Sequence, residues 1–163
     1  MTLDRLHLPL AQTVESMADD TVSIAQARKS ELNDLALWVA DMLADSGQVD
    51  LTFICTHNSR RSHLAQVWAQ VGTEVAGLPS VRTYSGGTEA TACNPRTVAA
   101  MRRAGFQVAV KDTVHGATNP TYDVSMGKHV AGMACFSKTH TDEANPQQGF
   151  GAVMTCSSAD RGC

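Results

Sequence analysis

The chain has 163 residues, of which 43% are hydrophobic, and a formal net charge of −3. This length fits one ordinary domain with a buried core, and we expect no second catalytic domain within it. No stretch approaches the roughly 20 apolar residues of a membrane span, and no basic segment followed by an apolar run opens the chain. No lysine-rich run or aromatic-basic interleaving is present. We therefore expect a cytoplasmic protein without membrane or nucleic-acid partners.

Two helices are predicted ahead of the first strand. Residues 4–17 and 22–45 carry apolar side chains at mostly helical spacing, and Gly47 is placed to end the second helix. The first 50 residues contain nine acids and three bases, whereas the remainder contains seven acids and ten bases. We interpret 1–47 as an acidic helical extension and 48–163 as the domain that attracts an oxyanion. The extension either packs on this domain or forms a dimer contact.

The following part of the chain alternates short apolar runs with helical segments. The predicted strands and helices follow one another at residues 51–54, 63–76, 81–85, 95–104 and 106–110. Asn94 is a good helix cap and Pro95 a good first helical residue. This alternation predicts the α/β class, with a three-layer arrangement of a parallel sheet flanked by helices. Ligand sites of such sheets lie at the carboxyl ends of the strands.

Residues 111–149 are harder to interpret. Asn119-Pro120 and Asn145-Pro146 indicate turns around a possible strand at 122–126, so an insertion or a lid is expected here. The segment 136–138 either borders the active site or belongs to an ordinary surface excursion. A further strand is predicted at 151–155.

The loop between the first strand and the next helix carries the main chemical signal. It runs from Cys55 to Ser62 and reads Cys-Thr-His-Asn-Ser-Arg-Arg-Ser. A loop that opens a helix points several backbone N–H groups at one place, where the helix dipole adds positive charge, so a tetrahedral oxyanion fits there. The planar guanidinium of Arg61 can donate two hydrogen bonds to such an oxyanion at once. The same field lowers the pKa of a thiol, which makes Cys55 a candidate thiolate nucleophile.

The predicted oxyanion-binding loop consists of Thr56, His57, Asn58, Ser59, Arg60, Arg61 and Ser62. The alternative is that Cys55 is a small buried residue at a strand end, which leaves the asparagine, arginine and serine of the loop unexplained.

The Cys-x5-Arg-Ser pattern, with Asn58 at its fourth place, resembles the low-molecular-weight protein tyrosine phosphatase family and, within it, the thioredoxin-coupled arsenate reductases. The segment 84–89 with the helix after Asn94 also resembles that branch. The resemblance covers about 49–106 and 150–163. It implies that Asn58 holds the loop, Ser62 hydrogen-bonds the thiolate, and Arg61 clamps the oxyanion.

Three further loop positions stay open. The family has one arginine in this place, so Arg60 either belongs to the oxyanion-binding loop or simply points to solvent. His57 and His63 either tune the thiolate or have structural roles.

Two cysteines near the end of the sequence suggest redox chemistry. In the reductases that the chain resembles, a pair spaced like Cys156 and Cys163 forms a redox segment. The resemblance implies that Cys156 attacks an arsenate adduct on Cys55 and that Cys163 resolves the disulfide, with thioredoxin or another thiol as reductant and no bound cofactor. The alternative is two stray cysteines. The spacings fit no closed zinc site, and Cys93 and Cys135 are expected to be structural.

Three functions remain open. The first is arsenate reduction through the cysteine relay, and the second is a phosphatase acting on phosphotyrosine or small phosphate esters. The third is a noncatalytic oxyanion-binding or thiol-sensing module. The family continues through an Asp-Pro loop, which supplies a general acid, and a last helix, both absent from 48–163. We therefore expect this sequence to be a fragment of a longer protein.

Overall fold

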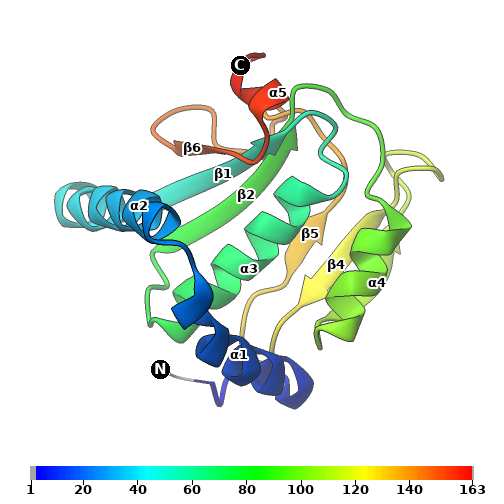
Figure 1. Cartoon of the computed structure of the whole chain (residues 1–163). Coiled ribbons are helices and arrows are strands. Elements are labelled where there is room, and N and C mark those ends of the chain that lie inside the picture. Colours follow the sequence, from blue (N-terminus) through cyan, green and yellow to red (C-terminus); the bar gives the residue numbers. More distant parts are fainter. Residues whose placement is uncertain (1–2, 163) are drawn as a thin grey trace.

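The computed structural model describes residues 3–162 (Figure 1). Its centre is a parallel sheet in the order β2-β1-β6, formed by β1 (Val49–Cys55), β2 (Val81–Gly87) and β6 (Gly151–Met154). β1 is buried along almost all of its length, as expected for the central strand of a parallel sheet. The predicted α/β class, with a parallel sheet flanked by helices, is confirmed. The carboxyl end of β1 is Cys55, which lies opposite Gly87 in the register.

Two helices pack on the same face of this sheet. Side chains of α2 (Gln26–Ser46), including Trp38, and alanines of α3 (Arg61–Val75) contact Leu51 and Phe53 of β1. Gly47 ends α2 in the left-handed conformation at φ 74°, as its position in the sequence predicted.

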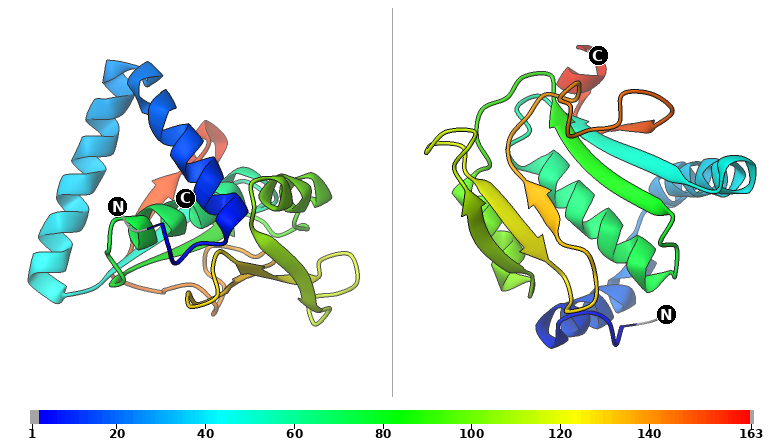
Figure 2. Two further views of the ribbon diagram at one scale, coloured as in Figure 1. Left: turned by 90° about the horizontal axis from the view of Figure 1, so that it is seen from below. Right: turned by 180° about the vertical axis from the view of Figure 1, so that it is seen from behind.

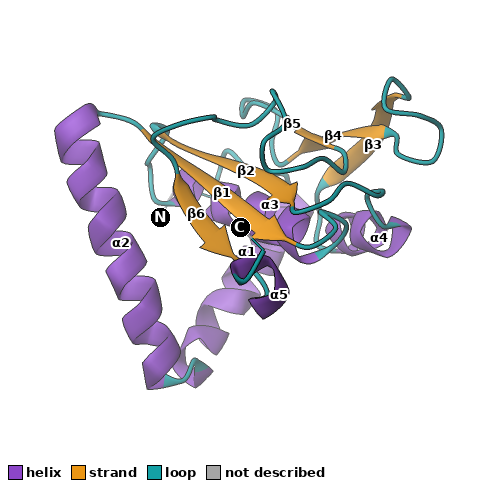
Figure 3. Cartoon of the chain, turned by 90° about the horizontal axis from the view of Figure 1, so that it is seen from above, coloured by secondary structure: helices purple, strands orange, loops and turns teal. Residues whose placement is uncertain are grey.

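The N-terminal helices form a V beside the domain (Figures 2 and 3). α1 (Leu8–Asp20) is joined to α2 by a single 3-10 turn, Thr21–Ser23. Leu10 of α1 is fully buried in a core that it shares with Val67 and Val71 of α3, so the extension packs on the domain. None of the helices between residues 3 and 162 has the length and apolar character that crossing a membrane requires.

The third predicted strand differs from the expectation. β3 (Gln107–Asp112) does not join the parallel sheet but pairs antiparallel with β4 (Thr121–Ser125), which pairs antiparallel with β5 (Met133–Cys135). The short connection from β3 to β4 fits an antiparallel pair, because a parallel crossover needs about a dozen residues or more. The place in the parallel sheet belongs to β6 instead. The helix before β3, α4 (Pro95–Arg103), begins as predicted, with Asn94 accepting a hydrogen bond from the Arg96 N–H.

The outer edge of β2 is occupied by side chains of α3. Gln66 donates to the Thr83 carbonyl at 3.1 Å, and Gln70 accepts from the Thr83 N–H at 3.0 Å and donates to the Val81 carbonyl at 3.4 Å. These glutamines satisfy backbone groups that a neighbouring strand would otherwise bind. The helix that starts at the Cys55 loop is thereby tied to β2.

Candidate active site

Cys55 lies at the end of β1 with its thiol against the first turn of α3. The residue is 4% exposed, and its Sγ lies 3.1 Å from Ser62 Oγ. Burial opposes ionisation of this thiol, but the Ser62 hydroxyl and the backbone N–H groups of Ser62, Ser59 and Asn58 together outweigh burial and lower the pKa of Cys55. The site therefore makes this thiol easier to ionise, which is the direction that the sequence predicted.

Asn58 fixes the shape of the loop. It is the one non-glycine residue with positive φ in the described part of the chain, at 42°. Its side-chain amide donates to Ser62 Oγ at 2.8 Å, and its side-chain oxygen accepts from the Lys138 N–H at 3.0 Å. This agrees with the role that the family resemblance implied for Asn58.

The outer side of the loop is held by the start of α4. The Ser59 hydroxyl donates to the Ala92 carbonyl at 2.6 Å, and the Ser59 carbonyl accepts from the Asn94 N–H at 3.0 Å. Thr56 is held on the other side, where its carbonyl accepts from the Glu89 N–H at 2.9 Å. The loop is thus anchored at both ends before any anion binds.

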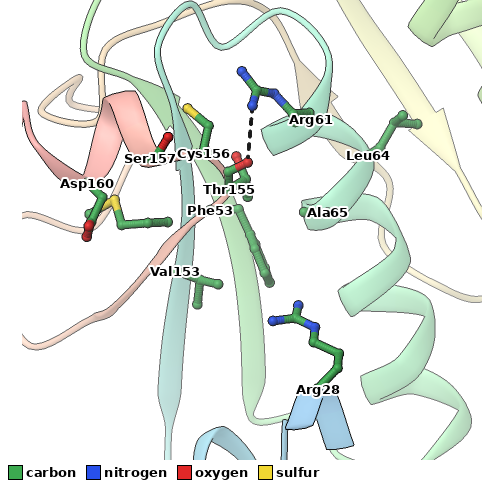
Figure 4. Close-up of a pocket in the computed structure, with 11 residues that line it drawn as sticks. Arg28, Phe53, Arg61, Leu64, Ala65, Val153, Thr155, Cys156, Ser157 and Asp160 are labelled. Atoms are coloured by element: carbon green, nitrogen blue, oxygen red, sulfur yellow. Dashed lines mark hydrogen bonds between the residues drawn. The ribbon is translucent and has the colours of Figure 1, made fainter. Parts of the chain in front are cut away.

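A small pocket of about 200 Å³ opens above the thiol. Its walls are Cys55, His57, Ser59, Arg60, Arg61, Thr91 and Asn94. Arg60 is exposed and also lines this pocket. Arg61 is exposed and directs Nη1 to the Thr155 carbonyl at 3.4 Å (Figure 4). Both arginines therefore line the hollow next to Cys55.

Cys156 lies beside the loop because β6 pairs with β1. The register of Ile54 with Met154 brings the residues after both strands together, and Cys156 Sγ lies 3.6 Å from Thr56 Oγ1. The Thr56 hydroxyl, followed by the Ala159 N–H and, more weakly, the charge of Arg61, lowers the pKa of Cys156 to about 7. Cys163 lies outside the described residues.

A larger cleft of about 650 Å³ extends from Cys156 along the sheet (Figure 4). Its floor is apolar and includes Phe53, Leu64 and Val153, while Arg28 of α2 stands at one end. Asp160, at the end of the short helix α5 (Ser157–Asp160), also lines it. Arg61 lines both this cleft and the smaller pocket, so the two hollows meet at its side chain.

The two histidines near the loop have different environments. His57 is exposed, and its Nε2 lies 2.8 Å from Glu89 Oε1, which is an ion pair whenever the ring is protonated. His63 is fully buried and pairs through Nδ1 with the Ser85 hydroxyl at 3.2 Å. Burial, and then the charge of Lys138, lowers the pKa of His63 to about 3, so its ring is neutral. Neither ring hydrogen-bonds to Cys55 in the described structure, which favours structural roles.

The two remaining cysteines are buried thiols. Burial raises the pKa of Cys93 to about 11 and that of Cys135 to about 12. Both values are those of unreactive thiols, as expected for structural cysteines.

The segment 136–138 borders the site, which was one of the two alternatives. The Ser137 hydroxyl donates to the His57 carbonyl at 2.9 Å, and Lys138 binds Asn58 through its backbone. Asn119 holds Ser137 by two hydrogen bonds of 2.8 and 2.9 Å. Sequence reasoning missed Asn119, because Asn119-Pro120 was interpreted only as a turn.

Comparison with known proteins agrees with this geometry. Residues 50–124 match the profile of the family described as low molecular weight phosphotyrosine protein phosphatase. This part of the chain is therefore similar to that family. The match includes the whole loop and both strands that position it, so the resemblance predicted from the loop residues is confirmed.

The curated relatives that match the chain include arsenate reductases. The chain is 40% identical over 57 residues to arsenate reductase 2 of Staphylococcus haemolyticus, covering 35% of the chain and 40% of the relative. It is 42% identical over 59 residues to an arsenate reductase of Bacillus licheniformis, covering 35% and 38%. The matched part thus spans about 40% of the first relative's length. No solved structure matches the chain.

Proposed function

We propose that the chain reduces arsenate by a thiol relay on a low-molecular-weight phosphatase scaffold. The observation that carries the proposal is the position of Cys156, whose sulfur lies 3.6 Å from the hydroxyl of the residue that follows Cys55. The names of the matched relatives support the same chemistry. Ester hydrolysis through Cys55 alone does not require a second thiol.

In the first step, arsenate binds in the pocket above Cys55, where loop N–H groups and Arg61 neutralise its charge. The Cys55 thiolate attacks arsenic, an S–As bond forms, and one arsenate oxygen leaves as water after protonation. Arsenic stays in the +5 state. The Ser62 hydroxyl stabilises the Cys55 thiolate before this attack and again when the thiolate is released.

In the second step, the Cys156 thiolate attacks the Cys55 sulfur. An S–S bond forms, the S–As bond breaks, and its electron pair remains on arsenic, which leaves as arsenite. The two thiols are oxidised by two electrons and arsenic is reduced by two. The pKa of about 7 suits this step, because an attacking thiol works best when its pKa is close to the ambient pH.

The relay is completed by Cys163 and an external reductant. Cys163 attacks the Cys156 sulfur, which frees Cys55 and moves the disulfide to Cys156–Cys163. Thioredoxin or another dithiol then reduces that bond.

A single-turnover experiment tests this proposal. Fully reduced protein is mixed with arsenate, quenched with acid, alkylated, and mapped by peptide mass. We expect an arsenate-dependent Cys156–Cys163 disulfide in the parent chain and a trapped Cys55–Cys156 disulfide in Cys163→Ser. Phosphate is the matched control, because it occupies the same pocket but phosphorus is not reduced. Absence of any arsenate-dependent disulfide, in protein that still binds phosphate, overturns the relay.

One observation favours phosphate-ester hydrolysis as a second candidate. The cleft beside the pocket has an apolar floor, which suits the organic part of a phosphotyrosine or a small ester but has no role for arsenate. Under this alternative, Cys55→Ser abolishes ester turnover while Cys156→Ala leaves it unchanged. The same two variants tested with arsenate and with 4-nitrophenyl phosphate therefore separate the two functions.

A further inference from the structure

A second hollow lies apart from the catalytic loop, in the space between β2 and β5. It measures about 530 Å³, has residues of α3 in its wall, and shares no lining residue with the two hollows around Cys55 and Cys156. The right-hand view of Figure 2 shows β2 and β5 with α3 behind them. This volume is in the range of small-molecule sites. We call it the Lys138 cavity.

Lys138 is an unusual lining residue because its side chain is buried without an acidic partner. It is 5% exposed and lines the cavity. None of the four ion pairs formed by residues 3–162 includes it. Its Nζ lies 4.5 Å from the centre of the Phe136 ring, and the Asp142 carboxylate acts on it only as a charge, without forming a salt bridge. Buried lysines are rare unless they are paired with an anion. An anion bound in the cavity would therefore stabilise the charged form of Lys138.

The rest of the cavity suits an anion with an apolar body. Arg5 and Arg82 lie at its wall, and their carboxylate partners are Glu74 and Asp50, of which only Glu74 lines the cavity. The lining thus carries three cations and one acid. Apolar and aromatic contacts come from Pro79, Tyr84, Val130, Met133 and Phe136.

We propose that the Lys138 cavity binds a small organic anion, a carboxylate or a phosphate monoester with an apolar body, whose charged group pairs with Lys138. This site is distinct from the oxyanion pocket above Cys55. The ligand is held by the ammonium at one point and by the apolar wall along its length.

The cavity is linked directly to the catalytic loop. The backbone N–H of Lys138 donates to Asn58 at 3.0 Å, and its carbonyl accepts from the Gly87 N–H at 2.9 Å. A ligand that pairs with the Lys138 ammonium and shifts this residue therefore acts on Asn58, the residue that shapes the loop. Occupancy of the cavity is expected to change the rate at which Cys55 is alkylated by at least twofold.

The test uses 8-anilinonaphthalene-1-sulfonate, a fluorescent organic anion, titrated into the whole chain. We expect saturable binding at one site that weakens at least tenfold in Lys138→Met. Ala134→Phe, which fills the cavity from an exposed position on β5 without touching the charge, is expected to weaken binding equally. Lys111→Met, at an exposed lysine of β3, and Cys55→Ser are the matched controls and keep full affinity.

Circular dichroism confirms that each variant is folded. The proposal is overturned if folded Lys138→Met and Ala134→Phe bind the probe as the parent chain does. It is equally overturned if binding is lost in Arg61→Ala, since the probe then sits at the catalytic loop. An unchanged Cys55 alkylation rate at saturating probe overturns the link to the loop.

Discussion

Ser62 Oγ lies 3.1 Å from Cys55 Sγ, and its proton is available to that sulfur. The Asn58 amide donates to the same oxygen at 2.8 Å, so it takes an acceptor site of the hydroxyl and leaves the proton uncommitted. A thiolate can only accept, so Ser62 is the donor once Cys55 ionises. In that arrangement Ser62 stabilises the thiolate form.

Ser62→Ala should raise the pKa of Cys55. A hydrogen bond to a charged group contributes about 1.5–3 kcal/mol, which corresponds to roughly one to two pKa units. In a Cys156→Ala background, the rate of iodoacetamide alkylation of Cys55 should fall about tenfold near neutral pH and approach the parent rate at alkaline pH. Ser59→Ala is the control, because its hydroxyl binds the Ala92 carbonyl rather than the sulfur. Identical pH profiles for both variants would contradict the assignment of Ser62 as donor.

Arg61→Lys should weaken oxyanion binding more than Arg60→Lys. Lysine keeps the charge but loses the planar fork that binds two oxygens at once. If Arg61 is the clamp, calorimetric titration with phosphate should show about a 10- to 100-fold loss for Arg61→Lys and less than about threefold for Arg60→Lys. A larger effect at Arg60, which lines the same pocket, would transfer the clamp to that residue.

His63 should make the protein sensitive to acid. Its pKa is about 3 in the folded chain and about 6.5 when unfolded, so the unfolded chain binds an extra proton between these values. The stability due to the neutral ring is complete above about pH 6.5 and is lost progressively as the pH falls towards 3. The slope approaches 1.4 kcal/mol per pH unit within this window.

Urea unfolding of the parent chain and of His63→Gln, at pH values from 7 to 4, measures this effect. The parent chain should lose stability faster than the variant over that range. Parallel curves would show that His63 protonates without a penalty and that its burial has been overstated.

Gly105→Ala should loosen the contact between α1 and the domain. Gly105 has φ +100°, and a Cβ there would collide with the backbone nitrogen of Leu10. Gly116 has a similar φ of +95° but open space around it, so Gly116→Ala isolates the conformational cost of about 1 kcal/mol. Denaturant unfolding should show a loss at Gly105 at least about 2 kcal/mol larger than that at Gly116. Equal losses of unfolding free energy would mean that α1 moves away from the new Cβ at residue 105 at no energetic cost.

The features that sequence alone predicted are those encoded locally. Gly47 ends α2, Asn94 caps α4, and the loop after Cys55 opens α3, because each depends on neighbouring residues. The family resemblance rests on the same contiguous residues.

The features that it left open or missed depend on distant pairing. Whether 136–138 borders the site stayed open, because Ser137 and Lys138 contact the loop across 80 positions and no pattern of spacing in a single chain reveals such contacts. β3 has an ordinary strand composition, and nothing in its own residues indicates that it pairs with β4 in a separate sheet.

The glutamines of α3 have a consequence for association between chains. An exposed strand edge is a template on which a second chain can extend the sheet and begin to aggregate. Gln66 and Gln70 already occupy the Thr83 groups, and the Gly87 N–H and carbonyl are bound by the 138–140 segment. An incoming strand would have to displace all of these contacts at once. This side of the sheet is therefore protected from fibre growth by glutamine side chains in its middle and by the backbone of the 138–140 segment at its end.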